Sequence, residues 1–300
     1  MEFMQRSNPY SGLGGQSSGI PGFVTLDDVP APGGSSFSLG VGAKGPVAVD
    51  LSSESPHVLV NAPTGLGKSA VARSIAVQRL SLGDVVVVLD RKMHSHRWAR
   101  PLAPLVHYAD TTELIGSALV NLGRELTRRN QLVRDDANAL VGPRIIVLFE
   151  ETNATLTQLK SLDRQIAQGG YGALDAFADL MFMGRSVGMH VIAFAQLATY
   201  RSGLTADLIE NFGVKVMIGY SDKAWKWLVA DCGRYRVAPS GTGRAMVCHA
   251  GRARECQLLW IPEESAAEHV LSSGQAQRSA RSLAGSRSNL PPAWRQAIGR

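Results

Sequence analysis

The segment Ala62–Ser69 has the residue types needed to hold the phosphates of a nucleoside triphosphate. Its glycines let several backbone N–H groups converge on one phosphate, and the start of the following helix adds a partial positive charge. Lys68 would reach the β- and γ-phosphates, and the hydroxyl of Ser69 would complete the shell of a Mg²⁺ ion. The expected nucleotide contacts are Ala62, Pro63, Thr64, Gly65, Leu66, Gly67, Lys68, Ser69 and Ala70.

A second chemical element is an apolar run that ends in two acids. Ile145–Phe149 is followed directly by Glu150 and Glu151. In ATPases with a phosphate-binding loop, the first acid supports Mg²⁺ and the second polarises the attacking water. The first acid is usually Asp, and the extra methylene of Glu150 must change how the metal is placed. The alternative is that both acids merely cap a strand at the surface.

The residues around the phosphate-binding loop predict how it is positioned. The apolar run His57–Val60 precedes it, and Ser69–Leu82 has helical spacing of apolar residues before Gly83. Val85–Leu89 is a β-branched run typical of a strand buried on both faces. Strand, loop, helix and strand therefore form one βαβ unit. The first glycine of the usual loop pattern is replaced by Ala62, a mild departure at a position that needs a small residue.

The same alternation continues along the chain. Glu113–Val133 is amphipathic, and four further runs have the composition of strands: Ile145–Phe149, Val191–Ala195, Val214–Ile218 and Ala245–Val247. Buried strands that alternate with helices predict an α/β fold with a central, mostly parallel sheet covered by helices on both faces.

Composition narrows the class of protein. The chain has 300 residues and a formal net charge of +6. It contains no apolar run long enough to span a membrane and does not begin like a signal peptide, so we expect a cytoplasmic protein. Cys232, Cys248 and Cys256 lack metal-site spacing and are expected to be small buried side chains. His94 and His96 have no acidic or Cys cluster beside them in the sequence, which favours a solvated loop over a metal site.

The two chain ends differ from the middle. Residues 1–35 are rich in Gly, Ser and Pro, which predicts a flexible leader. Residues 263–300 are expected to form a basic, disordered tail. From Ser272 onward the tail has no acid and five arginines: Arg278, Arg281, Arg287, Arg295 and Arg300. This charge suits nucleic-acid phosphates, although a solubilising tail has the same composition.

Several segments in the same order resemble the FtsK/SpoIIIE-type DNA-pumping ATPases, including transfer proteins of actinobacterial mobile elements. The resemblance covers roughly residues 38–262. It depends on the lead-in strands at 39–60, the phosphate-binding loop, Leu89–Lys92, Glu125–Arg129, Gly184–His190 and Ala195–Gln196. Residues after Pro262 lack the apolar periodicity of the winged helix that often follows the motor in this family, so we expect no winged helix there. An extra stretch between Glu151 and Arg185, including Gln168–Gly172, would form a loop on the ring surface or in its lumen.

The resemblance implies a RecA-like P-loop NTPase core in residues 36–262, with ATP and Mg²⁺ as cofactors. It implies that Arg185 is an arginine finger acting on the ATP of a neighbouring subunit, and that Gln196 senses the γ-phosphate. Alternatively, Arg185 pairs with Asp179, and Gln196 is satisfied by backbone groups. The implied partners are double-stranded DNA, further copies of the chain in a hexameric ring, and anchoring or targeting proteins. Two functions remain open: a DNA translocase, and an ATP-binding adaptor with slow hydrolysis.

Overall fold

A ten-stranded sheet forms the centre of the protein. The computed structural model describes residues 19–285 except 32, 54–55, 167–169 and 197–202. The strand order is β2-β1-β10-β9-β8-β3-β7-β6-β4-β5. The strands are β1 (Ser36–Gly42), β2 (Gly45–Asp50), β3 (Val58–Asn61), β4 (Val85–Leu89), β5 (Val106–Ala109), β6 (Ile145–Phe149), β7 (Met189–Ala195), β8 (Val214–Met217), β9 (Arg244–His249) and β10 (Arg252–Leu258).

The six strands from β8 to β5 in the sheet order are all parallel, and the four strands from β2 to β9 extend the sheet in antiparallel pairs. Every residue of β4 and β6 is buried. Successive residues of these strands alternate between two apolar clusters, one on each face of the sheet. Their continuous apolar runs are explained by burial on both faces.

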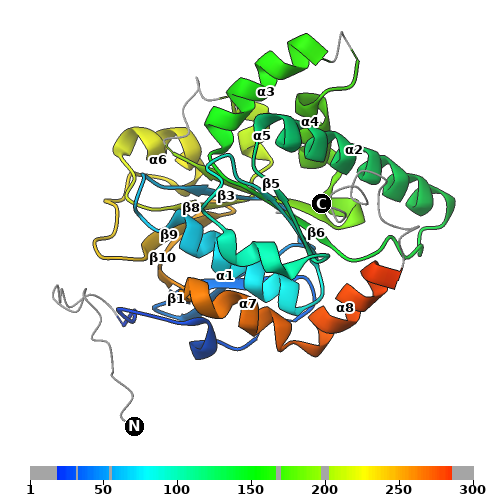
Figure 1. The fold of residues 1–300 in the computed structure, drawn as a ribbon. Coiled ribbons are helices and arrows are strands. Elements are labelled where there is room, and N and C mark those ends of the chain that lie inside the picture. The colour runs from blue at the N-terminus through cyan, green and yellow to red at the C-terminus, as the bar shows by residue number, and fades with distance from the viewer. Residues whose placement is uncertain (1–18, 32, 54–55, 167–169, 197–202, 286–300) are drawn as a thin grey trace.

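Helices cover both faces of this sheet (Figure 1). One face is covered by α1 (Lys68–Ser81), α7 (Glu263–Leu271) and α8 (Gly274–Gly285), and the other by α2 (Thr112–Asp135), α3 (Thr152–Ile166) and α4 (Ala173–Met183). Two short helices, α5 (Ala206–Glu210) and α6 (Asp222–Leu228), flank β8 in the sequence. Four 3₁₀ segments complete the described chain: η1 (Leu26–Asp28), η2 (Arg97–Leu102), η3 (Arg185–Val187) and η4 (Ala230–Cys232).

The strands and helices predicted from apolar patterning are confirmed. The predicted helix after the phosphate-binding loop is α1, the amphipathic stretch is α2, and the predicted strands are β3, β4, β6, β7, β8 and β9. The three cysteines are buried and free, as expected. The predicted α/β fold with a mostly parallel sheet is therefore correct.

The expectation of disorder is wrong for the described part of both chain ends. Val24, Leu26 and Val29 are buried in the core, so order begins well before residue 36. Helices α7 and α8 occupy most of the expected tail, and Ala266, Val270 and Ala276 pack into the same core. These helices bury mostly small side chains, which gives them a weak apolar pattern in the sequence. Residues 1–18 and 286–300, also expected to be flexible, lie outside the described residues, as do residues 168–169 of the expected extra loop.

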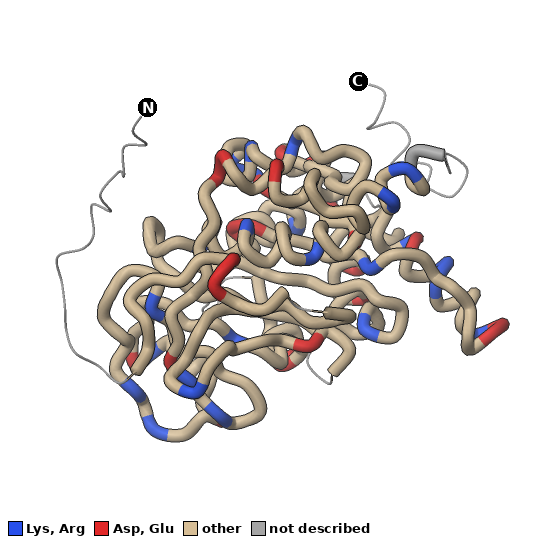
Figure 2. Tube along the Cα trace, turned by 90° about the horizontal axis from the view of Figure 1, so that it is seen from below, with Lys and Arg blue, Asp and Glu red and all other residues tan. Residues whose placement is uncertain are grey.

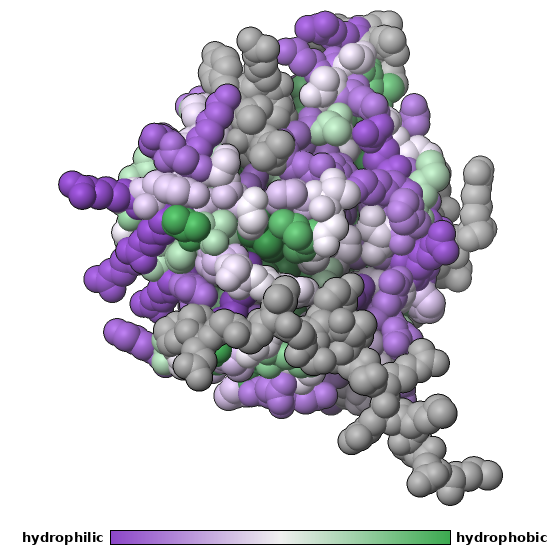
Figure 3. Space-filling model, turned by 90° about the vertical axis from the view of Figure 1, so that its left-hand side faces the viewer, coloured by the Kyte–Doolittle hydropathy of each residue, from purple (hydrophilic) through white to green (hydrophobic). Residues whose placement is uncertain are grey.

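Charge is distributed over the surface, with basic and acidic residues interspersed along the trace in Figure 2. On the face shown in Figure 3, hydrophilic residues predominate and hydrophobic ones form small separate patches. In residues 19–285, apart from the short gaps, no helix combines the length and apolar character required to cross a bilayer.

Candidate nucleotide-binding site

The phosphate-binding loop connects the end of β3 to the start of α1. Gly65 and Gly67 have φ angles of 83° and 88°, a conformation that a side chain disfavours. Ala62 is fully buried, and its N–H donates to the carbonyl of Ala195 at 3.1 Å. A methyl group at position 62 is therefore accommodated in the core, which explains why the departure from glycine does not disturb the loop.

The ammonium of Lys68 lies beneath this loop. Lys68 is 7% exposed, and its Nζ donates to the carbonyl oxygens of Ala62 and Pro63 at 3.0 and 3.1 Å. Burial lowers the pKa of Lys68, while the nearby carboxylates of Glu151 and Glu150 oppose that shift. A buried cation surrounded by backbone dipoles gains further stabilisation from an anion, so a phosphate group suits this position.

The sheet order brings the other predicted residues to the same edge. Strand β7 lies between β3 and β6, and the carboxyl ends of parallel strands meet at one edge of a sheet. Gln196 follows β7 and the two glutamates follow β6, so all three side chains lie beside the phosphate-binding loop. The predicted grouping of these residues, excepting Arg185, is therefore observed.

Glu150 and Ser69 are arranged as metal ligands would be. Glu150 is 1% exposed, and its Oε1 lies 3.5 Å from the Oγ of Ser69. Adjacent oxygen ligands of an octahedral Mg²⁺ lie about 3 Å apart, so this spacing fits a shared ion or a shared hydration shell. No group of three or more His, Cys, Asp or Glu side chains in the described chain could hold a metal. A Mg²⁺ ion here would therefore depend on phosphate and water for its other ligands.

Glu151 is held by a network on one of its two oxygens. Its Oε1 accepts from the Nζ of Lys92 at 2.6 Å and from the Nε2 of Gln196 at 2.6 Å. Burial alone would raise the pKa of Glu151, but the bonds from Lys92 and Gln196 outweigh it and lower the pKa. The backbone of Glu151 has a φ of 46°, a left-handed conformation that is uncommon outside glycine. Such strain often occurs at functional positions.

Gln196 links this acid to the phosphate-binding loop. Its Oε1 accepts from the hydroxyl of Thr64 at 2.9 Å, while its Nε2 donates to Glu151. Its side chain thus bonds to two other side chains, and the alternative of a glutamine satisfied by backbone groups is wrong. The Gln196 amide therefore connects the phosphate-binding loop to Glu151 through two hydrogen bonds.

Arg185 lies at the edge of the sheet where the parallel strands begin, opposite the edge that carries the phosphate-binding loop. It belongs to η3, directly before β7, whereas Gln196 directly follows that strand. The η3 turn is fixed to α2, because Arg129 donates to the carbonyl of Val187 at 3.0 Å and binds Glu125 at 2.7 Å. Seven residues of β7 separate the two edges by ~23 Å. Arg185 is therefore not brought together with the other predicted site residues of its own chain.

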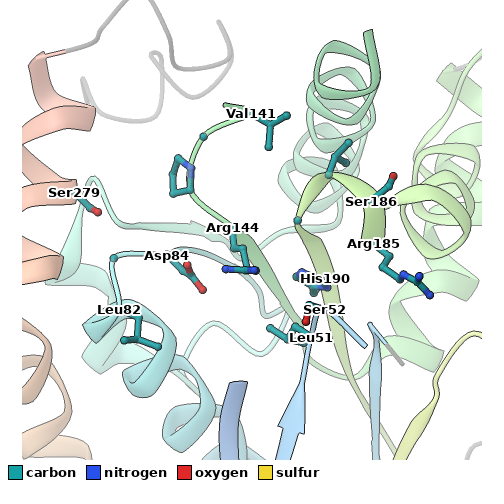
Figure 4. A pocket seen from close by; sticks show the side chains of 15 residues that line it. Leu51, Ser52, Leu82, Asp84, Val141, Arg144, Arg185, Ser186, His190 and Ser279 are labelled. Atoms are coloured by element: carbon teal, nitrogen blue, oxygen red, sulfur yellow. The ribbon is translucent and has the colours of Figure 1, made fainter. Parts of the chain in front are cut away.

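A pocket of about 620 Å³ lies at the edge of the sheet that carries Arg185 (Figure 4). Arg144 and Arg185 both line it, and Arg185 points away from Arg144. Neither arginine forms an ion pair with any residue of the described chain. The predicted alternative, a pair between Arg185 and Asp179, is wrong, because Asp179 accepts a hydrogen bond from Tyr171 at 2.9 Å instead.

Two residues of this site were not predicted from the sequence. The expectation that His96 belongs to a solvated loop is wrong, because His96 is fully buried and its Nε2 lies 2.9 Å from the Oε1 of Glu150. Lys92 was noted only as part of a family segment, and it binds Glu151. Both residues lie in the loop after β4, and β4 pairs directly with β6. That strand pairing was the missing information.

The strand order, the loop and the acids at the edge of the sheet define a P-loop NTPase fold of the RecA-like type. Solved structures with similar folds include a conjugation coupling protein and the ATPase domains of EssC and EccC. The pCW3 conjugation coupling protein TcpA, in monomer form with ATPγS, is 17% identical with a TM-score of 0.72. EssC ATPases 2 and 3 from Geobacillus thermodenitrificans are 15% identical with a TM-score of 0.65. The cytoplasmic domain of the type VII secretion ATPase EccC from Thermomonospora curvata is 15% identical with a TM-score of 0.61.

The extent of these matches differs. The alignments cover 84%, 89% and 81% of this chain, and they span 74% of the TcpA chain, 53% of the EssC chain and 28% of the EccC chain. No protein-family model and no curated protein matches the sequence. At these identities the similarity establishes the fold, which agrees with the fold expected from the family resemblance.

Proposed function

We propose that the protein is an ATP-hydrolysing motor that moves double-stranded DNA. The observation that carries this proposal is the convergence of Lys68, Ser69, Glu150, Glu151 and Gln196 at one edge of the sheet. An ammonium, a hydroxyl, two carboxylates and an amide are the groups that P-loop ATPases use for phosphoryl transfer. The fold similarity to a conjugation coupling protein solved with ATPγS supports both the nucleotide and the setting.

Each residue has a defined part in this proposal. The backbone of the loop and Lys68 bind the phosphates, and Ser69 and Glu150 support Mg²⁺, which neutralises charge that develops on the transferred group. Glu151 orients the attacking water and accepts its proton. Both hydrogen bonds to Glu151 go to Oε1, and no described residue donates to Oε2, so Oε2 is the oxygen available to water. Gln196 senses the γ-phosphate through a hydrogen bond to it.

Oligomer formation completes the active site in this proposal. Arg185 lies too far from its own phosphate-binding loop to contact a bound nucleotide, so it would act on the ATP of a neighbouring copy. A head-to-tail contact that places the Arg185 edge of one copy against the loop edge of the next can close into a ring. We propose a hexameric ring, located in the cytoplasm and connected to membranes by anchoring or targeting proteins.

DNA would be held through its phosphates. A translocase must move along any sequence, and contacts to the phosphate backbone carry no sequence information. The net charge of +6 favours such an anionic partner. The basic residues from Arg278 onward would add further contacts to the DNA phosphates.

The second candidate is an ATP-binding adaptor that hydrolyses slowly. It is favoured by the bond from Lys92 to Glu151, which occupies one oxygen of the proposed base. It is also favoured by Glu150 at the position where Asp is usual. An adaptor would bind its partners in an ATP-dependent manner, and its rate of ATP hydrolysis would not be raised by DNA.

The two candidates are distinguished by steady-state ATP hydrolysis with and without duplex DNA of mixed sequence. A motor should be stimulated at least tenfold by duplex DNA, and it should displace a third strand from a triplex in an ATP-dependent manner. The Glu151→Gln variant is the control for contaminating ATPases. Hydrolysis that is unchanged by DNA, with no strand displacement, would exclude the motor and favour the adaptor.

A further inference from the structure

His96 is a buried histidine whose imidazole has one hydrogen-bond partner in the described chain, the carboxylate of Glu150. Its ring is fully buried, and Nε2 lies 2.9 Å from the Oε1 of Glu150. Its Nδ1 has no hydrogen-bond partner in the described chain. Because a carboxylate only accepts, Nε2 is the nitrogen that donates. The whole hydrogen-bonding capacity of this ring is therefore directed at Glu150.

The loop that carries His96 is organised by Asp90, which directly follows β4. The Oδ2 of Asp90 accepts from the backbone N–H of Ser95 at 2.9 Å and from the hydroxyl of Tyr108 at 2.6 Å, and its Oδ1 accepts from the N–H of Lys92 at 3.1 Å. Asp90 is fully buried. The loop before His96 is consequently fixed at its start, and the imidazole is held against Glu150 by the fold.

A plain structural explanation for this pair is weaker than a functional one. Burying an imidazole and a carboxylate without full hydrogen bonding is costly, and an apolar pair of similar size would be at least as stable. The same Oε1 that accepts from His96 lies 3.5 Å from the Oγ of Ser69. The imidazole therefore fixes the carboxylate at the distance from Ser69 at which both can serve one cation.

We propose that His96 is a positioning residue for Mg²⁺ at the nucleotide site. It holds the carboxylate of Glu150, whose side chain is one methylene longer than the usual Asp, where it can support the ion. The inference depends on the proposed nucleotide site and deepens it. Hydrogen bonds to ligating carboxylates commonly account for 10–100-fold in metal affinity.

The test measures Mg²⁺ dependence separately from nucleotide binding. The affinity for a fluorescent ATP analogue is measured in EDTA and then across a Mg²⁺ titration, for the wild type and for His96→Phe. We expect His96→Phe to require about 10–100-fold more Mg²⁺, with the EDTA affinity within about twofold of wild type. His96→Gln, whose amide nitrogen can reach the position of Nε2, should recover most of the loss, and His96→Asn, which is shorter, should not.

Two further variants make the outcome specific. His190 is also buried but lies at the opposite edge of the sheet, so His190→Phe should leave the Mg²⁺ dependence unchanged. In a Glu150→Gln background, His96→Phe should add nothing, because both act on the same ion. If His96→Phe does not fold, the comparison of His96→Gln with His96→Asn still decides the matter.

Two results would overturn the inference. One is a wild-type Mg²⁺ requirement in a folded His96→Phe variant, or equal requirements in the Gln and Asn variants. The other is a loss of the same size in EDTA and in Mg²⁺, which would indicate general damage to the loop. Failure of the proposed nucleotide site would look different, because the wild type itself would then bind no ATP analogue in either condition.

Discussion

The two edges of the central sheet are built in opposite ways. At the edge where the parallel strands end, the polar side chains bind one another: Lys92 and Gln196 both donate to Glu151, and Gln196 accepts from Thr64. At the edge where these strands begin, Arg144 and Arg185 form no ion pair with the rest of the described chain and border an open pocket.

This difference is consistent with the proposed function, in which one edge binds a small ligand and the other contacts a separate molecule. Interconnected polar groups hold a preorganised shape, which suits the binding of a phosphate chain. An arginine without an ion-pair partner is stabilised when another molecule brings an anionic group to it. In the proposed function, a single chain binds nucleotide at one edge and presents at the other edge a charge that acts on the nucleotide of a second chain.

The largest expected effect comes from removing the central cation of the first edge. Lys68→Ala should abolish ATP turnover and greatly weaken ATP binding, because the triphosphate loses its main buried counter-charge. Binding of a fluorescent ATP analogue and phosphate release measure the two effects. Lys160→Ala, at an exposed position on α3, is the matched control. Wild-type ATP affinity in a folded Lys68→Ala variant would remove the basis for the site.

Glu151→Gln sharpens the comparison, because it separates chemistry from binding at the same edge. The amide cannot accept the proton of the attacking water, yet the phosphate contacts remain, so we expect turnover to fall by at least about 10²-fold with ATP still bound. Stoichiometric retention of radiolabelled ATP after gel filtration detects the trapped state. If Glu150→Gln trapped ATP and Glu151→Gln did not, the roles of the two acids would be reversed.

A smaller effect is expected from the chain end beyond α8, a helix that borders the second edge through Ser279. Since α8 packs into the core, the informative deletion is residues 286–300, which removes three arginines. The slope of log affinity for duplex DNA against log salt should become shallower by at most about 2.7 units, and DNA-free hydrolysis should persist. An unchanged slope would mean that these residues do not contact DNA.

The smallest effect concerns the ion pair between Lys92 and Glu151. The folded-state pKa of Glu151 is lowered, so the stabilisation is complete above its ordinary value of 4.5 and is lost as pH falls through the folded-state value. Lys92→Met should therefore lower the free energy of unfolding by no more than about 1 kcal/mol at pH 7, because Lys92 is partly exposed. The difference from wild type should shrink below pH 4.5. Urea unfolding at pH 7 and pH 3.5 measures this difference, with Lys160→Met at an exposed position on α3 as the control. A difference that does not change with pH would show that the ion pair is not responsible.

Much of the fold could be predicted because local pattern and global burial agree. The apolar runs of β4 and β6 are buried on both faces, and the glycines of the phosphate-binding loop adopt the positive φ angles that their position requires. The ordered ends could not be predicted this way. Ala266, Val270 and Ala276 bury small surfaces, and a count of charges and large apolar residues does not detect them.

The residues of the proposed site could be predicted where they lie close behind a strand. Lys68 begins the helix after β3, Glu151 is the second residue after β6, and Gln196 directly follows β7. They lie near one another because the sheet order aligns the strand ends. His96 could not be assigned, because it lies six residues beyond Asp90, and only the path of that loop brings its ring to Glu150. Contacts that depend on a folded loop require tertiary structure to be seen.

The central claim is that the nucleotide site of one subunit is completed by Arg185 of another. It is tested most directly by mixing Arg185→Ala subunits with Glu151→Gln subunits, each inactive alone, and measuring DNA-stimulated ATP hydrolysis. Sites formed between an Arg185→Ala loop edge and a Glu151→Gln arginine edge are intact, so activity should reappear on mixing and rise with total protein concentration. No activity at any mixing ratio, with wild-type hydrolysis per subunit constant down to monomeric concentrations, would contradict the account.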